Sequence, residues 1–206
     1  MGNLKGSLYL CTPARDDLAE FITQCIQGGV DVVQLREKRL ADKELYRVAV
    51  ECCQVCRELG VPFFVNDRAD IALACGADGV HVGQDDLGVD KVRALVGSDL
   101  MVGISTHAPQ EFDTAITLDV NYISVGPVVP TPTKLGRPGT GLEYVTYATS
   151  KWANPIFVTG GVTPDSVPDY YRAGARCFVV VRYLTESSSP KQAALRLRES
   201  INQVSL

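Results

Sequence analysis

The sequence has little of what several protein classes require. Lys and Arg total 20 against 24 Asp and Glu, a formal net charge of −4, so no broad basic face for nucleic acid is expected. No apolar run approaches the roughly 20 residues that span a bilayer, which predicts no membrane-spanning helix. The first residues lack a long apolar segment followed by a small-residue cleavage site, so we expect no signal peptide.

Cysteine is present, but without a recognisable metal or disulfide pattern. There are seven, and Cys53 and Cys56 have a spacing seen in redox and zinc sites. No second pair and no His follows at zinc-site spacing, so Cys52, Cys53 and Cys56 are interpreted as small apolar side chains on a helix. Reduced thiols favour a cytoplasmic location.

Apolar runs alternate with helix-like segments along the chain. The runs are continuous, as expected for parallel strands buried on both faces. The predicted strands cover 7–12, 30–36, 62–67, 78–83, 100–106, 120–126, 155–161 and 175–184. The predicted helices cover 15–29, 41–60, 68–76, 88–97, 108–119, 141–153, 163–174 and 190–203, with Pro168 expected to disturb the seventh.

Eight strand-helix units predict an α/β fold, a single-domain (β/α)8 TIM barrel over residues 1–206. A doubly wound parallel sheet is the alternative, because the pattern does not establish that the sheet closes. The longest irregular stretch, Gly126 to Gly141, is a candidate binding loop or lid.

Polar or glycine-rich residues follow most of the predicted strands, at the barrel rim where active sites of this fold lie. Gln34, Arg36 and Lys38 are spaced by two, so they share one side of an extended strand, whereas Leu35 and Glu37 face the other way. An Arg fork and a Lys suit a phosphorylated ligand. The alternative is a solvated strand end whose charges pair locally.

Two carboxylates end adjacent predicted strands. Asp67 and Asp86 would lie close together, and hard oxygen ligands beside a phosphate favour Mg²⁺. A soft-metal site is disfavoured, since no Cys or His cluster accompanies them. Asp67 could instead cap the following helix, and Asp85 competes with Asp86 as the ligand.

A glycine pair and two further polar residues complete the rim. Gly160 and Gly161 would let a phosphate approach backbone N–H groups, and Arg182 would add charge from the last strand. The alternative is an ordinary tight turn before a helix capped by Thr163. His107 is either a general acid-base group or a helix-start residue, and its nearness to Ser105 along the chain argues against a catalytic triad.

Five segments, in order, together resemble the thiamine-phosphate synthase family: "VVQLREK", "FFVNDRADIALACGADGVHVGQDD", "VGISTH", "YISVGPVVPTPTK" and "VTGGVTPDSV". The resemblance runs from about Leu8 to Val181. It implies a (β/α)8 barrel. It also implies a Mg²⁺-dependent transferase that joins 4-amino-2-methyl-5-pyrimidinylmethyl diphosphate to a carboxylated thiazole phosphate, releasing diphosphate and CO₂.

The resemblance also implies roles for individual residues. The pyrimidine diphosphate would be held by Gln34, Leu35, Arg36, Glu37, Lys38, Asn66, Ser105 and Lys134, with Arg36, Lys38 and Lys134 catalytic. The metal ligands would be Asp67 and Asp86. The thiazole phosphate would be held by Thr131, Pro132, Thr133, Gly160, Gly161, Val181 and Arg182. The family often has Ile-Ser where this chain has Val181 and Arg182, which puts a hydroxyl contact there in doubt.

Two other functions remain open at this point. A thiazole tautomerase would share the barrel but bind only the thiazole phosphate, so it would not need the diphosphate-binding set of Arg36, Lys38, Asn66, Asp67, Asp86 and Lys134. A catalytically silent thiazole-phosphate binder would not need the metal carboxylates. The sequence leaves open whether the chain forms a homo-oligomer.

Overall fold

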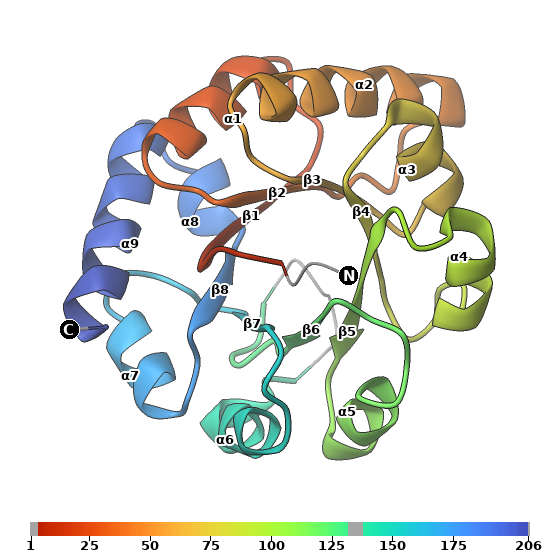
Figure 1. Ribbon diagram of the computed structural model, residues 1–206. Helices are drawn as coiled ribbons and strands as arrows, with labels where there is room; N and C mark the ends of the chain where they lie inside the picture. The colour runs from red at the N-terminus through yellow and green to blue at the C-terminus, as the bar shows by residue number, and fades with distance from the viewer. Residues whose placement is uncertain (1–3, 132–137, 206) are drawn as a thin grey trace.

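The eight apolar runs form a closed barrel of parallel strands in a computed structural model that describes residues 4–131 and 138–205 (Figure 1). Each strand pairs with the next one in the chain, and the eighth pairs with the first. The helices form an outer ring around the barrel. The prediction of a TIM barrel is confirmed, and the doubly wound alternative is wrong.

The strands are β1 (Leu8–Thr12), β2 (Val32–Leu35), β3 (Phe63–Asn66), β4 (Gly79–Val82), β5 (Met101–Thr106), β6 (Tyr122–Val125), β7 (Ile156–Thr159) and β8 (Cys177–Val180). The helices within the described residues are α1 (Leu18–Gln27), α2 (Asp42–Glu58), α3 (Ala69–Cys75), α4 (Val89–Val96), α5 (Pro109–Ala115), α6 (Gly141–Lys151), α7 (Val167–Arg172), α8 (Arg182–Thr185) and α9 (Pro190–Val204). Most elements begin later or end earlier than predicted.

The largest difference from the prediction lies after β8. The strand was expected to reach residue 184, but it ends at Val180, and Arg182–Thr185 forms the short helix α8. Arg182 therefore opens a helix and does not extend a strand. The segment "VVVRYL" is too short and too apolar for periodicity to separate a strand end from one helical turn.

Pro168 lies in the first turn of a helix and does not interrupt one. α7 begins at Val167, so the missing N–H of Pro168 removes no intrahelical hydrogen bond. The preceding residues form a turn, in which the Thr163 N–H donates to Ser166 Oγ at 2.9 Å. Ser166, not Thr163, is the N-cap residue of α7.

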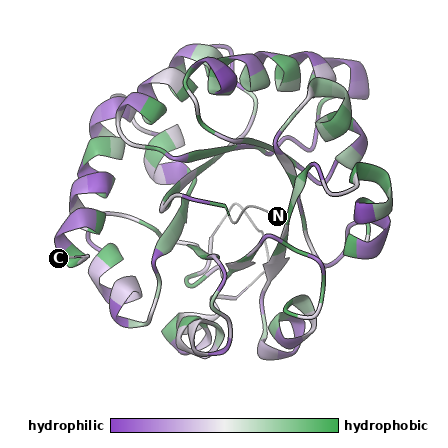
Figure 2. Cartoon of the chain, in the orientation of Figure 1, coloured by the Kyte–Doolittle hydropathy of each residue, from purple (hydrophilic) through white to green (hydrophobic). Residues whose placement is uncertain are grey.

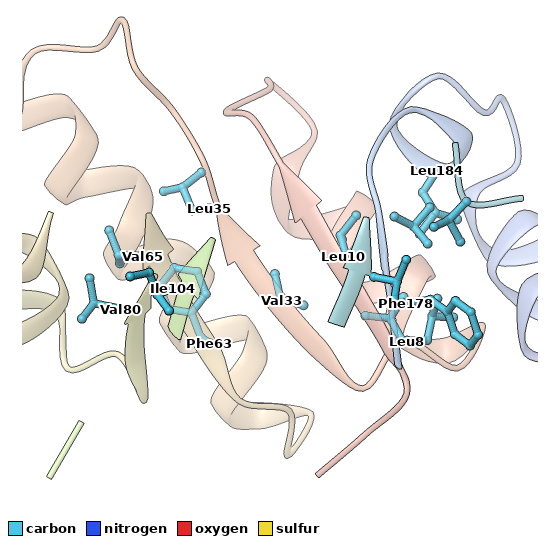
Figure 3. Packing of buried hydrophobic residues seen from close by; sticks show 14 of the residues in the cluster. Leu8, Leu10, Val33, Leu35, Phe63, Val65, Val80, Ile104, Phe178 and Leu184 are labelled. Atoms are coloured by element: carbon cyan, nitrogen blue, oxygen red, sulfur yellow. The ribbon is translucent and has the colours of Figure 1, made fainter. Parts of the chain in front are cut away.

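Alternating strand side chains divide the core into two layers. Leu8, Leu10, Val33 and Leu35 face outward and pack under the helices (Figure 3). The side chains that alternate with them point into the barrel, where the buried hydrophobic cluster consists of Leu4, Tyr9, Val32, Phe64, Tyr122 and Phe157. Hydrophobic residues line the strands and the inner helix faces, and hydrophilic residues lie mainly on the outer surface (Figure 2).

The cysteines behave as buried apolar residues, as predicted. Cys52, Cys53 and Cys56 are buried on α2, and all seven cysteines of the chain are free thiols. Burial raises the pKa of the Cys56 thiol to about 12, so it stays protonated and unreactive. Within residues 4–131 and 138–205, no helix is long and apolar enough to cross a membrane.

Candidate active site

A cavity of about 330 Å³ opens at the C-terminal ends of the strands. A second hollow, of about 230 Å³, adjoins it, and Thr159, Val179 and Val181 line both. The first lobe is lined mainly by residues from β2 to β5, and the second by residues that follow β6, β7 and β8. The site therefore has room for two ligands side by side.

The basic wall of the first lobe comes from β2. Gln34 is buried in the strand, and Arg36 and Lys38 follow its end, yet all three side chains line the cavity. Leu35 instead packs in the outer core, and the Glu37 carboxylate turns back to accept a hydrogen bond from the Arg39 N–H at 2.8 Å. The predicted division between the two sides of "QLREK" is thus observed, although the strand itself ends at Leu35.

Asp67 has an unusual backbone conformation. Its φ is +64°, the one positive φ of a non-glycine residue in the described part of the chain. The N–H of Asp67 donates to the His81 carbonyl at 2.7 Å, which holds the residue across the end of β4. A positive φ is sterically costly for such a residue and persists where the surroundings enforce it, often at functional sites. Asp67 does not cap α3, whose N-cap is Arg68, so the capping alternative is wrong.

Asp67 and Asp86 meet at the cavity wall, within hydrogen-bonding reach of each other. Asp86 Oδ2 accepts from the Gly83 N–H at 2.8 Å, which fixes it in the turn after β4. Burial and the nearby Asp86 carboxylate raise the pKa of Asp67, and Lys38 partly opposes this. The Asp67 carboxyl and the Gly83 N–H lower the pKa of Asp86 against the effect of burial. Asp85 also lines the cavity but is exposed.

This pair of carboxylates fits Mg²⁺. Two close carboxyl oxygens disfavour joint ionisation, and a hard divalent cation between them removes that repulsion. Among the residues that the structure describes, no cluster of three or more His, Cys, Asp or Glu side chains could hold a metal. Mg²⁺ commonly uses one or two carboxylates and takes its other ligands from substrate phosphates and water.

The floor of the first lobe contains polar residues that the sequence interpretation missed. Ser105 and Asn66, which were predicted, line it, but so do His81, Tyr9 and Tyr122. These three residues lie inside apolar strands, and no role was predicted for them from the sequence. A period-two pattern was available to find His81, because it alternates with Val80 and Val82 in "GVHVG" and so faces the barrel interior.

His107 also lines the first lobe, at the start of the loop that leads into α5. Its Nδ1 is hydrogen-bonded to the carbonyl oxygen of Gly126, and its N–H donates to Glu111 Oε2 at 2.7 Å. These contacts tie the ends of β5 and β6 together. They match the helix-start interpretation of His107 better than a general acid-base role.

The second lobe is built around the glycine pair after β7. Gly160 and Gly161 have φ of +94° and +70°. A Cβ at Gly160 would lie 2.6 Å from Pro127 Cβ, so the turn passes directly against the loop after β6. Arg182 at the start of α8 lines the same hollow, as does Thr131. The other predicted residues of this group, Pro132 and Thr133, lie outside the described residues, as does Lys134.

The structure thus brings together most of the predicted residues that it describes. Gln34, Arg36, Lys38, Asn66, Asp67, Asp86 and Ser105 line the first lobe. Thr131, Gly160, Gly161, Val181 and Arg182 line the second. The side chains of Leu35 and Glu37 point elsewhere, so a role for them in binding would rest on their backbone groups.

Comparisons with known proteins agree with this geometry. The thiamine monophosphate synthase family model matches residues 8–184. The thiamine-phosphate synthase of Mycolicibacterium smegmatis is 43% identical over 211 residues, which cover 96% of this chain and 93% of that protein. The thiamine-phosphate synthase of Acidothermus cellulolyticus is 44% identical over 192 residues, covering 91% of each chain.

A solved structure leads to the same group of proteins. The thiamine phosphate pyrophosphorylase from Pyrococcus furiosus superposes with a TM-score of 0.88 at 26% identity, covering 96% of both chains. This chain belongs to the thiamine-phosphate synthase family of transferases.

Proposed function

We propose that this chain joins 4-amino-2-methyl-5-pyrimidinylmethyl diphosphate to a carboxylated thiazole phosphate, with Mg²⁺, to give thiamine phosphate, diphosphate and CO₂. The observation that carries the proposal is the two-lobed cavity. One lobe has basic residues beside a carboxylate pair, the other has a glycine turn beside Arg182, and they join at Thr159, Val179 and Val181. Such a site would accommodate a diphosphate in one lobe and a monophosphate in the other.

The first lobe would take the pyrimidine diphosphate. Arg36 and Lys38 supply cationic donors for the diphosphate, and Lys38 Nζ lies 3.0 Å from Asp67 Oδ2. Gln34, Asn66 and Ser105 supply neutral hydrogen-bonding groups at the floor for the aminopyrimidine. Lys134 is assigned to the same diphosphate from its place in "TPTK".

Asp67 and Asp86 would hold Mg²⁺ against the diphosphate. When bound there, the ion would neutralise negative charge on the leaving group and orient it. Lys38, already paired with Asp67, would keep its ammonium beside the same phosphate oxygens. Asp85 is exposed beside Asp86 and is the alternative ligand.

The second lobe would take the thiazole phosphate. Positive φ angles at Gly160 and Gly161 turn the backbone sharply, and neither glycine has a side chain of its own to keep a phosphate from its main-chain N–H group. Arg182 lies at the start of α8, the position where TIM barrels commonly complete a phosphate site with a short extra helix. Its guanidinium can replace the hydroxyl that the family often places there.

The chemistry needs no protein nucleophile. Diphosphate leaves the pyrimidine methylene carbon, and the electron-rich aminopyrimidine ring spreads the positive charge that develops. Arg36, Lys38 and Lys134 stabilise the charge that grows on the leaving diphosphate. The thiazole nitrogen, held in line by its phosphate in the second lobe, then forms the new bond. The alkylated, positively charged ring loses its carboxyl group as CO₂, and the ring carbon takes up a proton from solvent.

The test is formation of thiamine phosphate by the purified protein from both substrates, with Mg²⁺ and with EDTA. Product that requires Mg²⁺ supports the proposal. Isomerisation of the thiazole phosphate without condensation would instead indicate a thiazole tautomerase. Tight binding of the thiazole phosphate with no turnover under either condition would indicate a silent binder.

Three further expectations belong to this proposal. Seven free cysteines, five of them buried, are compatible with a reducing cytoplasm, which fractionation of the native cells would test. A homo-oligomer is an open expectation that light scattering would decide. The loop 126–141, a candidate lid or binding loop from the sequence, lies partly outside the described residues, and its protection from proteolysis by substrate would test a lid role.

A further inference from the structure

A hydrogen-bond network of six side chains crosses the barrel beneath the first lobe. Cys11 Sγ donates to Gln34 Oε1 (3.3 Å), and Gln34 Nε2 donates to the Tyr9 hydroxyl (2.9 Å). The Tyr9 and Tyr122 hydroxyls are 2.9 Å apart, and Tyr122 OH lies 2.8 Å from His81 Nδ1. The network ends where His81 Nε2 lies 2.8 Å from Ser105 Oγ.

These contacts have a direction, because each hydroxyl carries one proton. Tyr9 accepts from Gln34, so its own proton is available for Tyr122. A Tyr122 hydroxyl that accepts this proton has its own proton available for His81 Nδ1, 2.8 Å away. A His81 that accepts at Nδ1 carries its proton on Nε2 and donates it to Ser105 Oγ.

The two phenols are built to remain protonated donors. Tyr9 and Tyr122 are completely buried, and burial raises the pKa of both hydroxyls far above physiological pH. Gly103 makes the space for Tyr122, since a Cβ there would lie 2.1 Å from Tyr122 Cζ. The Tyr122 ring also stacks on His81, with 5.4 Å between ring centroids.

We infer that Tyr122 is a positioning residue: it holds His81 as the Nε2–H tautomer, so that Ser105 accepts from His81 and donates its own proton to a hydrogen-bond acceptor of the bound pyrimidine diphosphate. If every hydrogen bond in this network ran the other way, Ser105 would donate to His81 and would present an acceptor to the ligand instead. The direction of the hydrogen bonds therefore decides whether Ser105 can pair with an acceptor or with a donor of the ligand. Two facing donors, or two facing acceptors, would leave buried polar groups unsatisfied. The identity of the ligand rests on the proposed function, but the direction of the hydrogen bonds in the network does not.

The tautomer can be measured directly because the chain has only two histidines, His81 and His107. Protein labelled with ¹⁵N-histidine, free of ligand and at a pH of about 8, would be studied by long-range ¹H–¹⁵N correlation NMR. The variant His107→Gln assigns the two rings. We expect His81 to have a protonated Nε2 and an unprotonated Nδ1. A wild-type His81 protonated on Nδ1 would overturn the inference.

The variant Tyr122→Phe removes the donor to Nδ1 and keeps the volume of the ring. We expect its His81 to lose the single Nε2–H tautomer and its KM for the pyrimidine diphosphate to rise about fivefold, with KM for the thiazole phosphate unchanged. Tyr144→Phe is the matched control, because the buried Tyr144 hydroxyl donates to Thr106 Oγ1 at 2.7 Å and is not part of the hydrogen-bond network. Tyr144→Phe should change neither the His81 tautomer nor the KM for the pyrimidine diphosphate.

An unchanged tautomer in Tyr122→Phe would also overturn the inference. If that variant does not fold, the wild-type tautomer still decides. Absence of thiamine phosphate from the wild-type reaction would sink the proposed function alone, because the NMR measurement uses the ligand-free protein.

Discussion

Lys38 Nζ lies 3.0 Å from Asp67 Oδ2, so a lysine that follows β2 is ion-paired with a carboxylate at the end of β3. The Asp67 side chain is 21% exposed and that of Lys38 is 52% exposed, so solvent screens the pair and it adds little stability. Asp67 also keeps a positive φ and a second carboxylate, Asp86, beside it. The positive φ and the neighbouring carboxylate are each unfavourable for folding alone, and together they indicate a site kept for binding.

Removal of one carboxylate should raise the Mg²⁺ concentration that the reaction needs. In Asp86→Asn we expect kcat/KM to fall on the order of a hundredfold at limiting Mg²⁺, because a charged metal ligand is lost. Asp85→Asn is the control, as its exposed side chain stands next in the chain. The measurement is initial rate against Mg²⁺ concentration. A larger loss in Asp85→Asn than in Asp86→Asn would reassign the metal ligand.

The same site should cost stability when no metal is bound. Burial and the neighbouring Asp86 raise the pKa of Asp67, so the folded protein holds this proton more tightly than the unfolded chain. Stability therefore falls as pH rises from the unfolded value, about 3.9, through the folded one, and the full penalty applies above the folded pKa.

We therefore expect Asp67→Asn to raise Tm by about 1 to 3 °C in EDTA at neutral pH. Asn also tolerates the positive φ at this position. The gain should shrink as the pH is lowered towards the point where both states of the wild type are protonated. Thermal unfolding at several pH values is the measurement, and a lower Tm in the variant at pH 7 would contradict this account.

Lys134 should stabilise the departing diphosphate. It lies outside the described residues, so this prediction rests on its position in "TPTK" and on the family. Loss of one preorganised cationic donor in Lys134→Ala should cost on the order of 3 kcal/mol in transition-state stabilisation, about 150-fold in kcat/KM. Lys151→Ala is the control, because Lys151 pairs with Asp113 at 2.8 Å on the outer surface. A kcat/KM for Lys134→Ala within about threefold of wild type would remove Lys134 from the mechanism.

Gly160 should be needed for the thiazole phosphate. In Gly160→Ala the new Cβ would lie 2.7 Å from the Val128 nitrogen, so the turn must shift away from the loop after β6. We expect KM for the thiazole phosphate to rise about tenfold, with KM for the pyrimidine diphosphate little changed. Gly60→Ala is a matched control, since Gly60 also has a positive φ, +69°, but nothing within 4 Å of the added carbon. Equal changes in KM for the two variants would show that Gly160 serves the fold only.

Much of the fold followed from the sequence because its signals are local. Continuous apolar runs separated by helical segments predict buried parallel strands, and polar residues such as Asp67 and Asp86 at the run ends predict one functional rim. The spacing of Gln34, Arg36 and Lys38 predicted which side chains line the cavity, because side-chain direction alternates along extended backbone. Leu35 and Glu37 point elsewhere for the same reason.

Where local signals were weak, the expectations failed. "VVVRYL" is compatible with a strand or a helical turn, and the start of α8 at Arg182 was therefore missed. The network residues His81, Tyr9 and Tyr122 were missed as well. They lie within apolar strands, and the sequence of those strands resembles that of an ordinary hydrophobic core.

The sequence by itself determined the α/β class with eight strand-helix units, the polar rim and most of the residues on it, because these depend on period, charge and order along the chain. Only the tertiary structure decided that the sheet closes, that Asp67 and Asp86 meet, and that the two lobes join. It alone placed Tyr122 between Tyr9 and His81, residues 113 and 41 positions away in the chain. Contacts between such distant residues depend on how eight strands are arranged around one axis, which no local pattern records.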